Sequence, residues 1–146
     1  MIKIMKYLGQ VRRCAGLFLS KEYEEIGIGT WQDSYLIAVC DTPGVSQEEI
    51  AARLYVHKSN VARHLGSLEE KGFIYREPDK NDRRVLRAYP TAKAAAAAKR
   101  IRAAREEWNA RVLSGFEREE AETLSRLLQK LADNAISAAQ EREKER

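Results

Sequence analysis

The chain has 146 residues, of which 44% are hydrophobic, and a formal net charge of +4. This length predicts a single domain with a modest core, and the small positive charge permits a polyanionic partner without requiring one. Two cysteines exclude a disulfide framework, and no stretch approaches the ~20 apolar residues that a membrane helix needs. Charged residues interrupt the N-terminal stretch and leave no apolar core of a signal peptide, so we expect a cytoplasmic protein.

The residue patterns of most enzyme sites are missing. The two histidines lie at positions 57 and 64, no glycine-rich phosphate loop follows a predicted strand, and no cluster of His, Cys and carboxylates has metal-ligand spacing. The sequence therefore favours a protein that is not an enzyme and that needs no cofactor or metal.

The first predicted element is an amphipathic helix over residues 4–25. Its apolar positions recur at spacings of four and three: Ile4, Leu8, Val11, Ala15 and Phe18. Gly27 and Gly29 end this helix, and Thr30 is expected to cap a short second helix around Leu36. The turn Asp41-Thr-Pro-Gly44 follows.

Residues 46–72 predict a helix-turn-helix. Ser46 and Glu49 form a capping box that starts one helix, which stops near Tyr55. A second helix follows at once with His57 at its start, and Gly72 supplies the positive φ that ends it. Two helices joined by so short a turn cross steeply, so the second presents one face outward. That face reads Lys58, Ser59, Asn60, Arg63, His64 and Ser67.

A β-hairpin follows the second helix. Residues 73–77 and 85–89 are rich in β-forming side chains, and the stretch between them has turn chemistry. The tip carries three basic residues: Lys80, Arg83 and Arg84. A helix-turn-helix followed by such a hairpin is a winged helix, so the predicted fold is mainly α with a small β-hairpin wing. Its outward helix can enter a major groove while the wing reaches a minor groove.

The rest of the chain predicts two further helices. Thr91 is expected to cap a helix that runs to about residue 112, and Gly115 separates it from a last helix that begins around Glu117. The last helix has an apolar stripe at Leu124, Leu128, Leu131, Ala135 and Ala138. A winged helix of about 70 residues covers only part of the apolar stripes on the terminal helices. We therefore expect a symmetric homodimer whose terminal helices interleave.

Several stretches together resemble the MarR family of bacterial transcription regulators. They are Ser46-Gln-Glu-Glu-Ile-Ala-Ala-Arg-Leu, Asn60-Val-Ala-Arg-His-Leu, Leu68-Glu-Glu-Lys-Gly-Phe-Ile, and Asp79-Lys-Asn-Asp-Arg-Arg84 with its spacing to Thr91. The resemblance covers nearly the whole chain. It implies one domain over residues 1–146, with a winged helix-turn-helix at about 30–90 and dimerisation helices at about 3–25 and 91–142. It also implies a regulator, more often a repressor, that binds a pseudo-palindromic operator in double-stranded DNA as a homodimer.

The candidate DNA-binding residues combine the outward face, the start of the first helix of the pair, and the wing. Asn60 and Arg63 have the chemistry to read adenine and guanine edges, and Lys58 and Ser59 suit phosphates. In the family, an acid at the position of Asp82 fixes the wing loop and an arginine at that of Arg84 enters the minor groove. The full set is Ser46, Gln47, Lys58, Ser59, Asn60, Arg63, His64, Lys80, Asp82, Arg83 and Arg84. Pro90 replaces the apolar residue that relatives usually carry before the threonine, so we expect a hairpin one residue shorter.

Three alternatives remain open at this stage. Some relatives sense peroxide through an early cysteine, but Cys14 and Cys40 lie beside apolar stripes and are expected to be buried small hydrophobes. Family effectors are often small aromatic or anionic molecules, for which Tyr7, Arg12, Trp31 and Tyr35 could provide stacking and a cation. Finally, a winged helix can dock on a protein partner in place of DNA.

Overall fold

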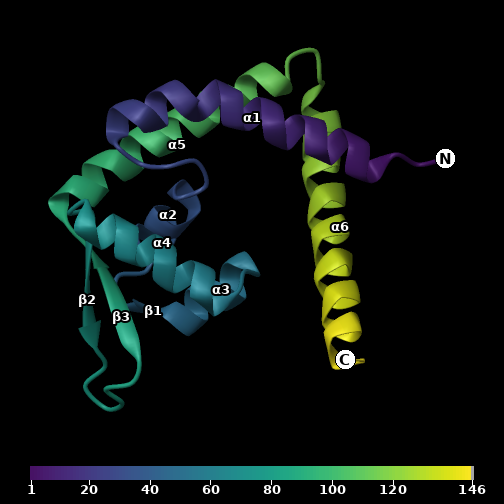
Figure 1. Cartoon of the computed structure of the whole chain (residues 1–146). Helices are drawn as coiled ribbons and strands as arrows, with labels where there is room; N and C mark the ends of the chain where they lie inside the picture. Colours follow the sequence, from purple (N-terminus) through teal and green to yellow (C-terminus); the bar gives the residue numbers. More distant parts are fainter. Residues whose placement is uncertain (146) are drawn as a thin grey trace. The chain divides into compact units, whose positions relative to one another are not determined.

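The computed structural model describes residues 1–145 and shows six helices and a three-stranded antiparallel sheet within them (Figure 1). The elements are α1 (Ile4–Ile26), α2 (Asp33–Asp41), β1 (Val45–Ser46), α3 (Gln47–Leu54), α4 (Lys58–Glu70), β2 (Ile74–Pro78), β3 (Leu86–Pro90), α5 (Ala92–Val112) and α6 (Arg118–Lys144). This confirms the predicted class, mainly α with a small β wing. The chain divides into two compact units, residues 1–108 and the segment that begins at Asn109. Arg146, the last residue of the predicted domain, lies outside the described part.

The core of the first unit lies where α2, α3 and α4 meet the sheet (Figure 1). Its largest fully buried side chains are Phe73, Leu36, Ile50, Leu65, Leu68 and Ile101. Leu65 and Leu68 lie on α4, so the second helix of the pair is anchored by its apolar face. Burying an aliphatic or aromatic side chain of this size stabilises a fold by about 1.5–3 kcal/mol. The opposite face of α4 is therefore free to carry polar residues.

The sheet differs from the predicted hairpin in two ways. Its strand order is β1-β3-β2, so the two-residue strand β1 adds a third member through the pair Val45 and Ala88. The sequence showed only a turn there, because two residues are too few to form a visible strand pattern. The expected shortening at Pro90 is wrong, since Pro90 pairs with Ile74. Proline is tolerated at this strand end because the next N–H, that of Thr91, donates to Phe73 O at 2.9 Å.

Local capping signals mostly act as the sequence predicts. Ser46 Oγ accepts from the Glu49 N–H at 3.1 Å, and Glu49 Oε2 accepts from the Ser46 N–H at 2.8 Å, which completes the capping box. Gly27 and Gly72 adopt φ of 91° and 79° where α1 and α4 end. The expectation for Thr30 is wrong: α2 begins after Gln32, whose Oε1 accepts from the Gly29 N–H and closes the preceding loop instead.

A buried polar triad joins α1, α2 and α5. Tyr23 Oη donates to Asp33 Oδ2 at 2.7 Å, and Arg105 donates to the same oxygen from Nη2 at 2.6 Å. Tyr23 and Asp33 are only 5% and 6% exposed, and burial together with the bond to Asp33 raises the pKa of Tyr23 above its ordinary value. The triad ties the long helices α1 and α5 to the start of α2.

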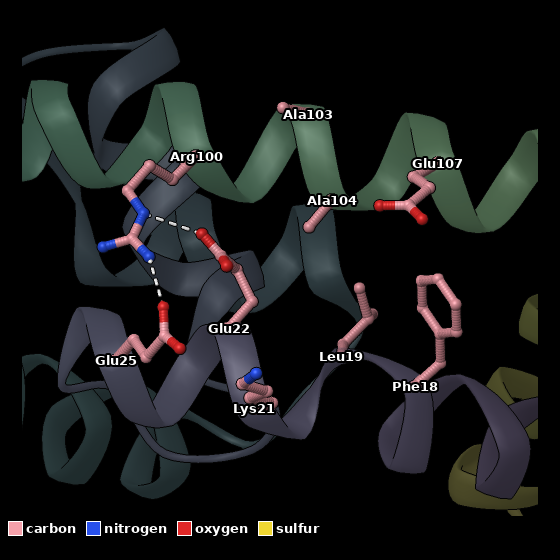
Figure 2. A pocket seen from close by; sticks show the side chains of 9 residues that line it. All are labelled: Phe18, Leu19, Lys21, Glu22, Glu25, Arg100, Ala103, Ala104 and Glu107. Carbon is pink, nitrogen blue, oxygen red and sulfur yellow. Dashed lines mark hydrogen bonds and ion pairs between the residues drawn. The ribbon is translucent and has the colours of Figure 1, made fainter.

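The helices α1 and α5 also run side by side along a charged groove of about 510 Å³ (Figure 2). Arg100 donates to both Glu22 and Glu25, at 2.7 and 3.0 Å. Leu19 and Ala104 form an apolar part of the same groove. Ion pairs at such an exposed edge contribute little stability, so the triad is the stronger tie between these helices and the rest of the unit.

Much apolar surface of the long helices stays exposed in the single chain. On α1, only Leu19 and Tyr23 are buried, and no residue of α6 is. The expectation that Cys14 is a buried small hydrophobe is wrong for this chain, because the neighbouring stripe of α1 has no core to pack on and Cys14 is exposed. Cys40 is half-buried, and burial raises the pKa of its thiol. No helix within residues 1–145 combines the length and hydropathy that crossing a membrane requires.

Replacing Asp33 should cost more stability than replacing Tyr23. Asp33→Asn leaves Arg105 without a charge partner, and since the Arg105 side chain is 35% exposed we expect a loss of about 1–3 kcal/mol in the free energy of unfolding. Tyr23→Phe removes one hydrogen bond and should cost about 0.5–1.5 kcal/mol. Urea unfolding at one fixed protein concentration measures both, with the exposed Glu24→Gln as the control. An Asp33→Asn protein as stable as that control would contradict the role of the triad.

Candidate nucleic-acid interface

The start of α4 is built by a histidine cap. His57 has extended backbone angles, and its Nδ1 accepts from the Ser59 N–H at 3.1 Å, with Ser59 Oγ 2.7 Å from the same nitrogen. A neutral imidazole can therefore do here what a Ser or Asp side chain does at most helix starts. Val56 packs against the core and Val61 is fully buried, so the first turn of α4 is anchored on its inner side.

The outer side of that turn presents the predicted polar face. Lys58, Ser59, Asn60 and Arg63 are all exposed. Arg63 donates to Asn60 Oδ1 at 3.3 Å, so the two side chains share one face and leave further guanidinium donors available. These residues can offer several hydrogen-bond donors to base edges and phosphates, which is the chemistry a recognition helix uses.

Two other residues of the predicted face are packed inward. The His64 ring stacks on Tyr35 of α2, with ring centroids 4.5 Å apart. Burial, and then the nearby Arg63, lowers the pKa of His64, so its imidazole is neutral near pH 7. Ser67 Oγ accepts from Gln32 Nε2 at 3.0 Å. His64 therefore has its ring face against the protein, and its contact with DNA stays a prediction.

The wing tip is shaped by two aspartates. Asp79 Oδ2 accepts from the N–H groups of Asn81 and Asp82, both at 3.0 Å, and Oδ1 accepts from Arg87. These hydrogen bonds, that from Arg87 first, lower the pKa of Asp79. Arg87 also donates to Gly44 O at 2.9 Å, which ties the base of the wing to the segment before β1. Neither Asp79 nor Arg87 stood among the predicted site residues, although the turn chemistry of residues 78–82 pointed to the first.

Asp82 aims Arg84. The Arg84 guanidinium donates to both carboxylate oxygens of Asp82, at 3.0 and 3.1 Å, and the Arg84 N–H donates to one of them as well. These bonds lower the pKa of Asp82 and raise that of Arg84. The Arg84 side chain is nonetheless 91% exposed, and Lys80 and Arg83 beside it are exposed too. The wing thus exposes three cationic side chains to solvent, and one of them, Arg84, is held by the carboxylate of Asp82.

The start of α3 carries the last two predicted residues. Ser46 is 6% exposed and its hydroxyl belongs to the capping box, so it supports this surface from within, and its contact with DNA stays a prediction. Gln47 is half-buried, and its Oε1 accepts from Arg76 of β2 at 3.1 Å. Sequence reasoning missed Arg76. No local signal marks it, because its partners Glu69 and Gln47 lie on two other elements.

A separate small cavity lies among α1, α2, α3 and α4. It measures about 330 Å³ and is lined by Arg12, Trp31, Ser34, Tyr35, Leu54, Val56 and His64. The Arg12 guanidinium lies 4.4 Å from the centre of the Trp31 ring. Three of the four residues predicted for an effector therefore meet here. Tyr7 does not line the cavity and is 57% exposed elsewhere on α1.

No group of three or more His, Cys, Asp or Glu side chains with metal-binding geometry occurs among the described residues. The surface formed by α4, the start of α3 and the wing offers hydrogen-bond donors and exposed cations. Such a surface suits a polyanion.

Comparison with known proteins finds relatives of this chain in sequence and in structure. The profile of the MarR family matches residues 26–85. Over 131 residues, the chain is 30% identical to a protein of Bacillus subtilis (strain 168) described as the uncharacterized HTH-type transcriptional regulator YybA, and the match covers 90% of this chain and 87% of that protein.

Solved structures agree with this relationship. The transcriptional regulator SlyA is 30% identical and superposes with a TM-score of 0.87, covering 92% of this chain and 94% of that one. A putative MarR family regulator from Listeria monocytogenes, crystallised with a 26mer DNA, is 27% identical with a TM-score of 0.86, covering 92% and 89%. The chain belongs to the MarR family of DNA-binding transcriptional regulators.

Proposed function

We propose that this regulator binds a pseudo-palindromic operator as a cytoplasmic homodimer and acts as a repressor. Each protomer places α4 in a major groove and its wing in the flanking minor groove. The observation that carries the proposal is Arg84, whose side chain is 91% exposed yet held on Asp82 by two hydrogen bonds. A fixed, solvated arginine at a wing tip matches what a narrow minor groove attracts.

The exposed face of α4 supports the same arrangement. Lys58, Asn60 and Arg63 offer cationic and amide groups at the first turns of the helix, the part that contacts base edges in helix-turn-helix proteins. The Listeria relative crystallised with DNA has the same fold. In a two-fold dimer the two α4 helices would lie about 34 Å apart, one turn of B-DNA.

Exposed apolar side chains support the dimer. The helix α6 is 27 residues long and has no buried residue. Its apolar side chains Leu127, Leu128 and Ile136 are 50%, 42% and 36% exposed. On α1, Ile4, Leu8 and Val11 are at least 40% exposed. Surfaces of this kind on two long helices favour burial against a second copy. Repression then requires only that the bound dimer occlude a promoter.

The cavity among α1, α2, α3 and α4 supports an effector. Arg12 supplies a cation, and Trp31 and Tyr35 supply aromatic faces, so a small aromatic carboxylate fits the chemistry of the lining. Such a ligand would shift the separation of the two winged helices by favouring one arrangement of the dimer.

Binding to duplex DNA should be tight, specific and steeply salt-dependent. The measurement is fluorescence anisotropy with duplex from the region upstream of the gene and with a scrambled duplex, each at several salt concentrations. We expect at least ~10³-fold preference for the upstream duplex, and a negative slope of log K against log salt that counts the phosphates contacted.

Arg84→Ala should weaken binding by about 1–3 kcal/mol. A polar exposed residue of α6, changed in Gln140→Ala, provides the control.

Two results would count against this proposal. Salt-independent or absent binding to every duplex would favour the alternative, a winged helix that docks on a protein. Unchanged affinity of Arg84→Ala for the upstream duplex would remove the wing from the interface while leaving the rest of it in place.

Light scattering at micromolar concentration should report twice the chain mass of 16.7 kDa. Leu128→Asp should shift the protein toward the monomer, because it buries a charge in the proposed apolar contact of α6. Lys130→Asp also adds an aspartate to α6 but lies on the opposite side of the helix, so it should leave the mass unchanged. A wild-type mass of one chain would refute the dimer.

Benzoate should quench the fluorescence of Trp31 in a saturable way. The variant Trp108→Phe leaves Trp31 as the single tryptophan and keeps an aromatic ring beside Phe18. We expect Arg12→Ala to raise the Kd for benzoate about tenfold, the equivalent of one charge-assisted hydrogen bond. Quenching that does not saturate by about 10 mM, a weaker affinity than a specific site gives, would exclude this ligand class.

A further inference from the structure

Arg76 joins three elements of the DNA-binding surface. It lies on β2, its Nε donates to Glu69 of α4 at 2.9 Å, and its Nη1 donates to Gln47 of α3 at 3.1 Å. Its side chain is 22% exposed, so it is largely covered by these contacts. The same guanidinium lies across Gly66, where an added Cβ would be 3.8 Å from Nη2. That distance is an ordinary van der Waals contact, so the guanidinium packs against this part of α4.

The contact with Arg76 fixes which way the Gln47 amide faces. A guanidinium has only donors, so the oxygen of the amide must point to Arg76 and the Nε2 group must point away. No group within residues 1–145 accepts from Nε2. Every buried side-chain nitrogen or oxygen of the described part has a partner, so this unpartnered Nε2 reaches solvent. Gln47 therefore offers a pre-oriented donor at the first residue of α3.

A donor at this place suits a phosphate. In a helix-turn-helix, the first helix of the pair crosses the DNA backbone while the second enters the groove, and amide side chains are among the usual phosphate contacts. We propose that Arg76 is a positioning residue for DNA binding, which holds the Gln47 amide with its Nε2 group facing a backbone phosphate. This rests on the proposed function, since it assumes that α3 and α4 face DNA.

The variant Gln47→Glu separates this role from a purely structural one. A carboxylate accepts from Arg76 at least as well as the amide does, so the tie between α3 and β2 is kept. It has no donor, however, and it would place a negative charge against the phosphate. We expect the affinity for a mixed-sequence 30-base-pair duplex at low salt to fall about tenfold or more, with the thermal unfolding temperature unchanged or raised. A phosphate contact acts on any sequence, so this probe does not require the operator to be known.

Gln140→Glu provides the charge-matched control, because it makes the same charge change at an exposed position of α6. We expect it to alter affinity less than about twofold. If Gln47→Glu behaves like Gln140→Glu while the wild-type protein binds the duplex, the inference is wrong and the proposed function stands. If the wild-type protein shows no salt-dependent binding at all, the proposed function fails and this inference fails with it.

A double-mutant cycle tests whether Arg76 acts through Gln47. We expect Gln47→Ala to weaken binding about fivefold in the wild-type background and less than about twofold in an Arg76→Gln background, because the amide is no longer oriented there. Equal effects in both backgrounds would show that the two residues act independently, and would overturn the positioning role of Arg76.

Discussion

The orientation of α4 is the constraint on which the rest of this structure depends. A recognition helix, the role proposed for α4, needs a fixed apolar face, and Leu65 and Leu68 of α4 are fully buried. Hydrophobic contact alone is non-directional, however, and leaves rotation and sliding of the helix open. Contacts from α2 with its N-cap and from β2 remove that freedom: Gln32 donates to Ser67, the Tyr35 ring stacks on His64, and Arg76 donates to Glu69.

Arginines in this chain divide into two groups by their partners. Arg76 and Arg105 are largely covered and donate to carboxylates on other elements, so their charge is neutralised inside the scaffold. Arg63 and Arg84 lie in solvent, each donating to a residue two or three positions away. A local partner fixes the direction of a side chain without covering it. The formal charge of +4 is therefore a poor guide to the proposed interface, and the placement of the exposed cations is a better one.

Sequence reasoning succeeded where the determinant is local. The capping box of Ser46 and Glu49 and the glycine that ends α4 each depend on residues within a few positions of each other. It failed where the determinant is a distant contact. The strand β1 exists because β3 pairs with it, and the start of α2 depends on Gln32, which also reaches 35 residues along the chain to Ser67.

The difference between local and distant determinants also explains which residues of the candidate site could be predicted. The exposed face of α4 follows from helical periodicity, so Lys58, Asn60 and Arg63 could be named in advance. Periodicity also placed His64 on that face, but the position of Tyr35 on another helix decides that its ring stacks inward. Arg76 carries no local signal, because its function as a bridge exists only once β2, α3 and α4 have come together.

Trp31 lies between the proposed effector cavity and the contacts that hold α4. It is a bulky residue with φ of 71°, a backbone conformation that costs about 1–3 kcal/mol and persists only where surrounding contacts hold it. On one side its ring lies under Arg12, and on the other the chain continues into Gln32, which holds Ser67 of α4. His64 of α4 lines the same cavity as Trp31. A ligand bound there, as proposed above, would therefore contact both α4 and the strained residue beside Gln32, which is the link through which the proposed effector could bias the proposed recognition helix.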